Sequence, residues 1–222
     1  MSNLPALALI GLGATYDSIA AAWPRMVVGA RALIALPLTS TDGAADAAAL
    51  MVASLDAATM HVFVAIDQNA LNYARFDVYG RLRLLGFKSE TFVHPSAIVE
   101  SDVELKDGCW IGAGAIIGAG VRVGNCTFIG AGARVDSGVQ MGANSWIGPG
   151  ASIGRLTRLG KHCVVGADVR LGSSLVIGNH CVVDVPGSYS ASLADGTFID
   201  PLFSAPVRIY GSSTAKTTAA MR

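Results

Sequence analysis

Charged residues are scarce in this 222-residue chain. Lys and Arg together number 16, Asp and Glu also number 16, and charged residues make up 14% of the sequence, whereas about a quarter is usual. A formal net charge of zero argues against a non-specific nucleic-acid binder, which needs excess positive charge. The hydrophobic content of 52% excludes a disordered chain, because such a chain has too little apolar surface to bury.

Long apolar runs are missing, and cysteine is rare. The longest apolar stretch, from Met26 to Leu38, is interrupted by Arg31 and is too short to span a bilayer. The N-terminus has no basic segment of the kind that opens a secretory signal. Four cysteines are too few for a disulfide scaffold. We therefore expect a cytoplasmic protein with reduced cysteines and no membrane span.

Glycine, in contrast, is abundant, with 26 residues, and much of it belongs to a six-residue repeat. From Val93 to Val183 every sixth residue is aliphatic, sixteen in succession without an insertion, and the next residue is Gly at eleven of these positions. The aliphatic positions are Val93, Val99, Leu105, Ile111, Ile117, Val123, Ile129, Val135, Met141, Ile147, Ile153, Leu159, Val165, Leu171, Ile177 and Val183.

A period of six excludes both an α-helix and a simple strand, whose periods are about 3.6 and 2. An aliphatic residue followed by Gly instead indicates a short strand that ends in a turn. Three such units form an 18-residue triangular coil, and successive coils stack about 4.8 Å apart with the aliphatic residues inside. The sequence therefore predicts a parallel β-helix of a little over five coils.

The first ninety residues follow a different pattern. Strands are expected at 7–10, 26–36 and 61–66, and helices at 15–23, from about 42 to 55, and at 68–85. This alternation predicts a small parallel sheet of the Rossmann type. The turn Gly11-Leu12-Gly13 either provides a phosphate site or simply starts a helix close behind a strand.

We thus expect three parts. Residues 1–90 form a Rossmann-like α/β domain that binds a nucleotide sugar, residues 91–186 form the β-helix, and residues 187–222 form a C-terminal cap and tail. The segment 187–203 either closes the open end of the β-helix or reaches over a neighbouring subunit's site.

This combination resembles the sialic acid/bacillosamine acyltransferase family, which acetylates sugars in bacterial glycan and polysaccharide synthesis. The resemblance is carried by the strand–GLG–helix start and by the segments VAIDQN (64–69), LGF (85–87), HPSA (94–97), DVP (184–186) and APVRI (205–209). It implies a left-handed β-helix, an acetyl-CoA or other acyl-CoA donor, a nucleotide-linked sugar acceptor and a homotrimer. It also implies sites in the clefts between neighbouring prisms and transfer to an amino or hydroxyl group.

The chain departs from the family at three landmarks. Ser137 stands where the family's histidine base is expected, Trp146 replaces a second histidine, and Arg155 replaces the glycine whose amide forms the oxyanion hole. Two interpretations follow. An amine acceptor that binds already deprotonated can attack a thioester without a strong base, so N-acylation is retained. Otherwise the chain is a non-catalytic paralogue that serves as a binding or assembly subunit.

Residues 18 apart stack in columns on the prism. His162 and His180 form one column with Asn144 below them. The two histidines either act as a surrogate base or are simply exposed turn residues. His61 and His94 lie outside this column, so three ligands for zinc are lacking and no metal is expected. Phe92, Trp110, Phe128 and Trp146 form a second, outward column. It either packs in the trimer or against the N-terminal domain, or serves as a stacking platform for a base or sugar.

These considerations give a set of candidate site residues. The catalytic candidates are Asp136, Ser137, His162 and His180. The candidates for binding CoA are Gly148, Gly150, Arg155, Gly166, Ala167 and Arg208, with turn amides exposed by glycine expected to hold the pantetheine arm. The candidates for binding the acceptor are Gly11, Gly13, Asp67, Asn69 and Trp146.

Overall fold

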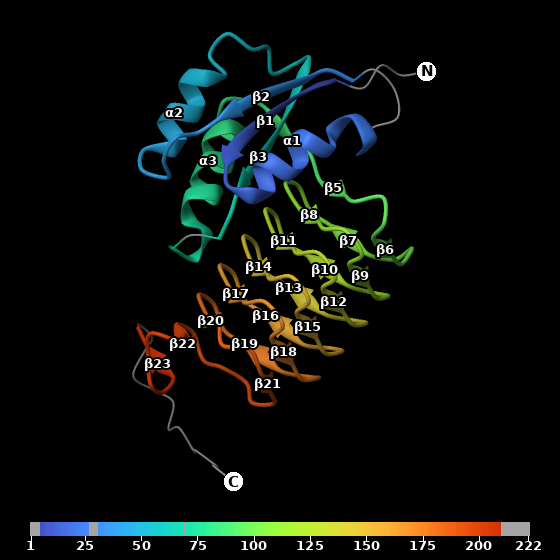
Figure 1. The fold of residues 1–222 in the computed structure, drawn as a ribbon, viewed down its shortest axis with the longest axis vertical. Helices are drawn as coiled ribbons and strands as arrows, with labels where there is room; N and C mark the ends of the chain where they lie inside the picture. The colour runs from blue at the N-terminus through green and yellow to red at the C-terminus, as the bar shows by residue number, and fades with distance from the viewer. Residues whose placement is uncertain (1–4, 27–30, 69, 210–222) are drawn as a thin grey trace.

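The computed structural model describes residues 5–26, 31–68 and 70–209. An α/β unit lies at one end, and a prism of stacked coils extends away from it (Figure 1). None of the helices within these residues is long and apolar enough to cross a membrane.

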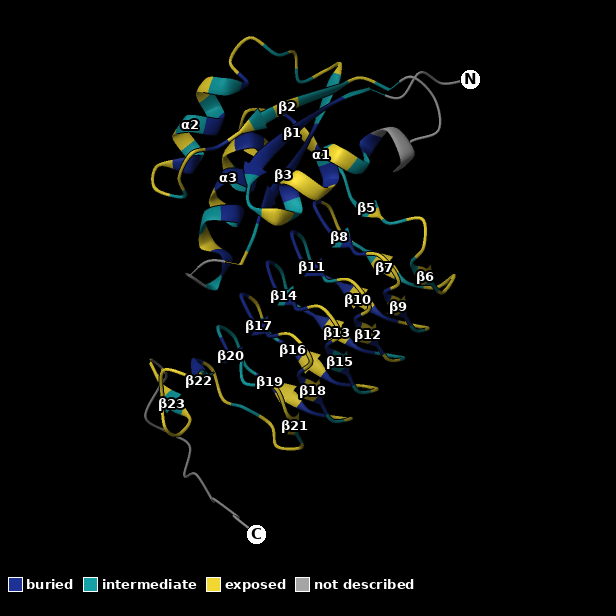
Figure 2. Ribbon diagram, in the orientation of Figure 1, coloured by how far each residue is buried: buried dark blue, intermediate teal, exposed yellow. Residues whose placement is uncertain are grey.

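The N-terminal unit is built on a four-stranded sheet with the order β2-β1-β3-β4, and all its pairings are parallel. The strands are β1 (Ala6–Leu12), β2 (Leu33–Pro37), β3 (Met60–Ile66) and β4 (Lys88–Ser89). The helices are α1 (Ala14–Met26), α2 (Ala44–Met51) and α3 (Tyr73–Leu84), and the 3-10 turn η1 (Ala70–Asn72) precedes α3. Figure 2 shows β1 and β3 as its most buried part, as their apolar sequences require.

The two faces of this sheet have different cover. Ala8 and Ile10 of β1 pack in one cluster with α2 and α3. Leu7 and Leu9 of the same strand face the other way, toward α1 and Phe128 of the β-helix. Because successive residues of a strand point to opposite faces, the continuous apolar run of β1 reflects a strand that is buried on both sides.

The β-helix has three parallel sheets of very short strands. The aromatic sheet contains β5 (Phe92–Val93), β8 (Trp110–Ile111), β11 (Phe128–Ile129), β14 (Trp146–Ile147), β17 (Val164–Val165), β20 (Val182–Val183), β22 (Thr197–Ile199) and β23 (Val207–Arg208). The β6 sheet contains β6 (Ile98–Val99), β9 (Ile116–Ile117), β12 (Arg134–Val135), β15 (Ser152–Ile153), β18 (Arg170–Leu171) and β21 (Ser188–Tyr189). The β7 sheet contains β7 (Glu104–Leu105), β10 (Arg122–Val123), β13 (Gln140–Met141), β16 (Arg158–Leu159) and β19 (Val176–Ile177).

The predicted aliphatic ladder is the core of this prism. From Ile111 to Val183 every ladder residue is buried in one continuous cluster, and Val99 and Leu105 pack against it from the first coil. The register is 18 residues throughout the repeat, as in the pairs Ile111–Ile129 and Ile129–Ile147. Coil stacking also continues past Val183, because β22 pairs in parallel with β20 and β23 then folds back on β22.

Several element boundaries differ from those expected. The strand expected at 26–36 begins only at Leu33, and Met26 belongs to α1. The helix expected at 68–85 starts at Tyr73, because Leu71 and Asn72 adopt left-handed backbone angles with φ of 60° and 64°. The alanine-rich helix ends at Met51 rather than near residue 55.

Aromatic rings join the two units. Phe63 of β3 stacks on Phe128 of β11 with ring centroids 5.8 Å apart, and it meets Phe92 edge-on at 5.0 Å. Trp23 of α1 also packs edge-on against Phe92, at 5.6 Å. These contacts show that the aromatic column packs against the N-terminal domain, which is one of the alternatives predicted for it.

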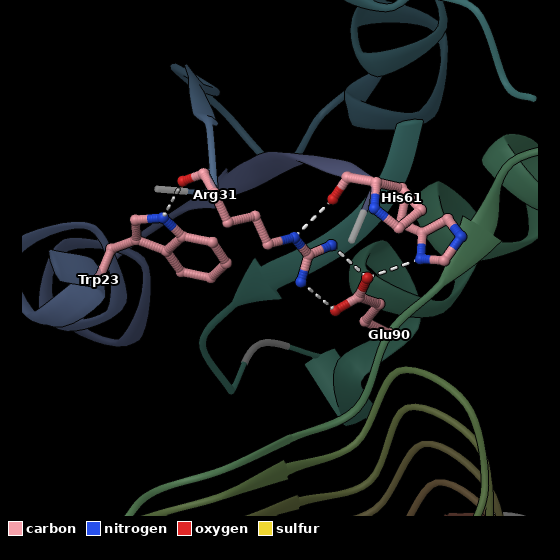
Figure 3. A network of polar contacts seen from close by, with 5 residues as sticks. Trp23, Arg31, His61 and Glu90 are labelled. Carbon is pink, nitrogen blue, oxygen red and sulfur yellow. Dashed lines mark hydrogen bonds and ion pairs between the residues drawn. The ribbon is translucent and has the colours of Figure 1, made fainter. Parts of the chain in front are cut away.

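A charged network fastens the same junction (Figure 3). Glu90, in the link between β4 and β5, forms an ion pair with the guanidinium of Arg31. Its Oε1 also lies 2.6 Å from His61 Nδ1. Arg31 Nε donates to the carbonyl of Pro5. Burial raises the pKa of Glu90, but the hydrogen bonds from Arg31 and His61 outweigh it, and the net pKa lies below the usual value.

Replacing Phe128 by Ala tests the aromatic junction. Phe128 is 1% exposed, so Phe128→Ala should lower the free energy of unfolding by about 3–5 kcal/mol, measured by denaturant titration. Phe203→Ala is the matched control, because Phe203 is 41% exposed and its loss should change stability little. Equal effects of the two substitutions would contradict this description of the junction.

Candidate functional site

A cleft of about 340 Å³ opens between α1 and the aromatic sheet. One wall comes from α1, the other from three rings of the aromatic sheet and the turns that follow them. The lining residues are Ala14, Thr15, Ser18, Ala22, His94, Trp110, Gly112, Ala113, Phe128, Gly130, Ala131, Trp146 and Pro149. A concave, largely apolar site with a few polar groups is the usual form of a small-molecule site.

Trp146 borders this cleft, as its expected role in acceptor binding requires. Its ring lies 5.9 Å from that of Phe128. The guanidinium carbon of Arg75, from α3, lies 4.2 Å from the centroid of Phe128 and 5.7 Å from that of Trp146. Arg75 is completely buried and also donates to the carbonyls of Ile66 and Ser145. The aromatic wall is therefore held from behind by a buried cation.

The other acceptor candidates lie where β1 and β3 end. Gly11 is in β1, against the carbonyl oxygen of Ala65 on β3, where a side chain would not fit. Gly13 precedes α1 with φ of 96°, and a Cβ there would collide with Asp67. Asp67 itself accepts hydrogen bonds from the amides of Ala14 at 2.6 Å and Thr15 at 3.1 Å. Asn69 lies outside the described residues.

His162 and His180 stack as predicted, with ring centroids 5.0 Å apart and planes 7° apart. His162 is not an exposed turn residue, however, because it is 8% exposed. It packs against Tyr73 and Phe76 around the start of α3. The expectation of two exposed histidines was wrong for His162, since the N-terminal domain covers this corner of the prism.

The hydrogen bonds of His162 make it a poor base. Asn144 Nδ2 lies 2.9 Å from His162 Nδ1 and 2.8 Å from the carbonyl of Asn72. An amide nitrogen donates, so Nδ1 accepts and the ring proton sits on Nε2. Burial and the neighbouring His180 lower the pKa of His162. The lone pair on His162 Nδ1 therefore accepts the hydrogen bond from Asn144 at the contact between the two domains and is not available to take up a proton from a substrate.

Asp136 and Ser137 lie at a different corner, in the turn after β12. Asp136 Oδ1 accepts a hydrogen bond from the amide of Ser137 at 2.8 Å. Asp136 also lines a groove of about 470 Å³ that contains Arg134 and Arg170. The exposed Arg155 lies one coil further on, next to Leu156, whose amide bonds to the carbonyl of Ser137.

The glycines expected to bind CoA lie at the third corner. The amides of Gly148, Gly150 and Gly166 donate to the carbonyls of Val165, Ala131 and Val183 respectively. These three N–H donors are used within the coils, so a pantetheine arm at this corner would need other groups. Ala167 is exposed in the same region, and Arg208 is exposed on β23.

The predicted residues are therefore spread over three corners of the prism. None of the four catalytic candidates lines the cleft beside α1, and a single chain does not bring them together. Among the described residues, no group of three or more His, Cys, Asp or Glu side chains is placed to hold a metal ion.

His94 lines the cleft, although it was expected only to lie in the HPSA link, outside the histidine column, and was not among the candidate site residues. It is the one histidine among the cleft-lining residues. Ser96 donates to His94 Nδ1 from its amide at 3.2 Å, and its hydroxyl lies 2.8 Å from the same atom. That hydroxyl accepts from the amide of Gly114, so Nδ1 is an acceptor and Nε2 carries the proton. His94 thus offers an N–H donor.

A signal for His94 was present in the repeat. His94 follows the first ladder residue, and the pairs Val93–Ile111 and Ile111–Ile129 place it in one column with Gly112 and Gly130. All three line the cleft. Reading this column beside the aromatic one would have drawn attention to His94.

Comparison with known proteins shows which folds this chain resembles. Residues 87–188 match the family model described as the GMPPB C-terminal domain. No curated protein matches the chain in sequence. The solved structures whose folds resemble it include a sugar N-acetyltransferase and an acetyltransferase domain.

Two solved structures show the likeness. One is a histidine-to-alanine mutant of GDP-perosamine N-acetyltransferase from Caulobacter crescentus in complex with CoA and GDP-perosamine. It has a TM-score of 0.72 and 22% identity, and the match covers 89% of this chain and 94% of that one. The other is the acetyltransferase domain of PglB from Neisseria gonorrhoeae in complex with acetyl coenzyme A. Its TM-score is 0.59 at 22% identity, with 92% and 100% of the two chains covered.

The predicted fold class is confirmed: a left-handed parallel β-helix of hexapeptide repeats follows a small Rossmann-like domain. The class of protein that the sequence resemblance indicated, the sugar acyltransferases, is also that of the structural neighbours.

The state of His162 predicts a pH dependence of stability. Its pKa is lowered in the folded protein, so its contribution is fully present above the unfolded value of about 6.5. That contribution is lost as the pH falls from there toward the folded pKa. His162→Gln should therefore reduce the fall in unfolding free energy between pH 7.5 and 5.5. His94→Gln, at a half-exposed site, is the control; an unchanged fall in His162→Gln would contradict this role.

Proposed function

We propose that the protein is a CoA-dependent acyltransferase that transfers an acetyl or similar group to the amino group of a nucleotide-linked sugar in glycan or polysaccharide synthesis. The observation that carries this proposal is a fold shared over 89% of the chain with an enzyme whose structure holds both CoA and GDP-perosamine. That relative holds both ligands although one of its histidines is replaced by alanine. Loss of a family histidine in this chain is therefore compatible with binding.

The cleft beside α1 supports this chemistry. Trp110 and Trp146 offer flat apolar faces for a sugar ring, and Thr15 and Ser18 offer hydroxyl groups for its polar substituents. His94 Nε2–H provides a donor for the oxyanion that develops when an amine attacks a thioester carbonyl. An amine that arrives neutral attacks the thioester carbonyl without a strong base, and the proton that it then loses is taken up by the departing CoA thiolate, which leaves as the free thiol. This suits a site whose lining contains no carboxylate.

Recognition of CoA would depend on groups other than the glycine amides. The amides of Gly148, Gly150 and Gly166 donate within the coils, but a pantetheine arm also carries N–H groups that can donate to turn carbonyls. Exposed arginines such as Arg155 and Arg208 supply charge for the phosphates of CoA.

A homotrimer belongs to this proposal, because neighbouring prisms would bring different corners together. The β6 and β7 sheets carry exposed aliphatic side chains, among them Ile98 at 59% and Val176 at 56% exposure. Burial of such residues favours association with another copy of the chain. Four free, buried cysteines suit a cytoplasmic site of action, because thiols stay reduced there.

Incubation with acetyl-CoA and a panel of amino-sugar nucleotides tests the activity. The purified protein should release free CoA, followed with a thiol reagent, and transfer one acetyl group per thiol. No release over a broad panel, together with no CoA binding in calorimetry, would contradict the proposal and favour a non-catalytic binding subunit.

Variants decide which corner is the reaction site. His94→Gln should lower kcat by about 100-fold, the usual effect of losing an oxyanion donor, with little change in KM. Ser137→Ala and His180→Ala should leave the rate unchanged if the cleft beside α1 is the site. A collapse of activity in Ser137→Ala with a normal His94→Gln would instead place catalysis at the corner of Asp136.

A further inference from the structure

The N-terminus of α1 is the position at which Rossmann-type sheets bind phosphate. The first amides of such a helix have no partner within the helix and carry the positive end of its dipole. A glycine-rich turn lets a diphosphate approach them. The sequence Gly11-Leu12-Gly13 followed by α1 has this arrangement.

In this protein the position is already occupied by Asp67. Its Oδ2 accepts from the amide of Ala14 at 2.6 Å, and its Oδ1 accepts from the amide of Thr15 at 3.1 Å. Both carboxylate oxygens thus make the bonds that two phosphate oxygens would make. Gly13 is needed for this contact, since any Cβ there would collide with the same carboxylate.

The charges near the cleft also disfavour a phosphate at the start of α1. No Asp, Glu, Lys or Arg is among the residues that line it. Asp17, also acidic and exposed, lies in the first turn of α1. The buried guanidinium of Arg75 packs on the rings of Phe128 and Trp146 and is not among the groups that line the cleft. A diphosphate at the start of α1 would meet Asp67 at contact distance, and like charges there are costly.

We propose that Asp67 is an internal anion that excludes phosphate from the N-terminus of α1. The acceptor is then recognised in this cleft through its uncharged sugar ring, and its diphosphate lies outside the GLG turn. Asp67 is thus a specificity residue that holds α1 in place and selects against a phosphate there. This inference rests on the proposed function for the identity of the acceptor, but its physical content is a binding preference that needs no turnover.

Calorimetric titration with inorganic pyrophosphate, and with UDP and GDP, tests the proposal on the full chain. Asp67→Asn keeps the size of the side chain and one acceptor but removes the charge, and Asp67→Gly frees both amides. Affinity for pyrophosphate should rise in the order wild type, Asp67→Asn, Asp67→Gly, with a gain of about tenfold or more in the last. Asp17→Ser is the matched control, because it removes a charge from the same turn without freeing the amides of Ala14 and Thr15, and it should therefore raise the affinity much less than Asp67→Gly.

Unchanged or weaker pyrophosphate binding in both Asp67 variants would overturn the proposal. So would wild-type binding that the Asp67 substitutions abolish, because Asp67 would then be part of the diphosphate site. If Asp67→Gly fails to fold, as circular dichroism would show, the isosteric Asp67→Asn decides alone. Failure of the acyltransferase proposal would appear separately, as absence of CoA release by the wild type.

Discussion

The stacking of the coils is the constraint on which the rest of this structure depends. All strands of the β-helix but one are only two residues long, so the hydrogen bonds between coils must engage the turn residues as well as the strands. The amide of Gly148 bonds to Val165, and a Cβ on Gly148 would approach the amide nitrogen of Ala167 to 2.6 Å. Glycine is therefore required at such positions after the ladder residues, because the next coil lies too close to leave room for a side chain. The amide of Gly148 is already used between coils, so a ligand that approaches this residue cannot rely on that donor.

The same stacking decides where the N-terminal domain lies. Residues 18 apart form columns, and one column of large rings makes a single face of the prism apolar. The α/β unit covers that face through Phe63 and Trp23, and the buried Arg75 is held between carbonyls and rings. Asn144 and His162 extend the contact to the start of α3. The cleft beside α1 is the part of this face that remains open.

Much of the fold followed from the sequence because its signals are periodic. Sixteen aliphatic residues at intervals of six leave no other architecture, and the inward and outward columns followed directly from the 18-residue coil. The start of α3 could not be predicted in this way, because the left-handed angles of Leu71 and Asn72 accompany contacts with Asn144, more than seventy residues away.

The site was less predictable, because it also depends on contacts between residues that are far apart in the sequence. Candidates selected by their match to family positions lie at three separate corners, and the exposed or buried state of His162 depends on a domain that the repeat does not encode. Trp146, which was selected because it matches a family position and also belongs to the aromatic column, does line the cleft. His94 was missed because its role arises from the column that it shares with Gly112 and Gly130, beside a helix from the other domain.

A crystal structure of the protein with CoA and an amino-sugar nucleotide would test the central claim most directly. The account predicts that the sugar ring lies between α1 and Trp146, with His94 Nε2 facing the position of the thioester carbonyl oxygen and Asp67 still bound to Ala14 and Thr15. A diphosphate on those two amides with Asp67 displaced, or a sugar bound at the corner of Asp136 and Ser137, would contradict it.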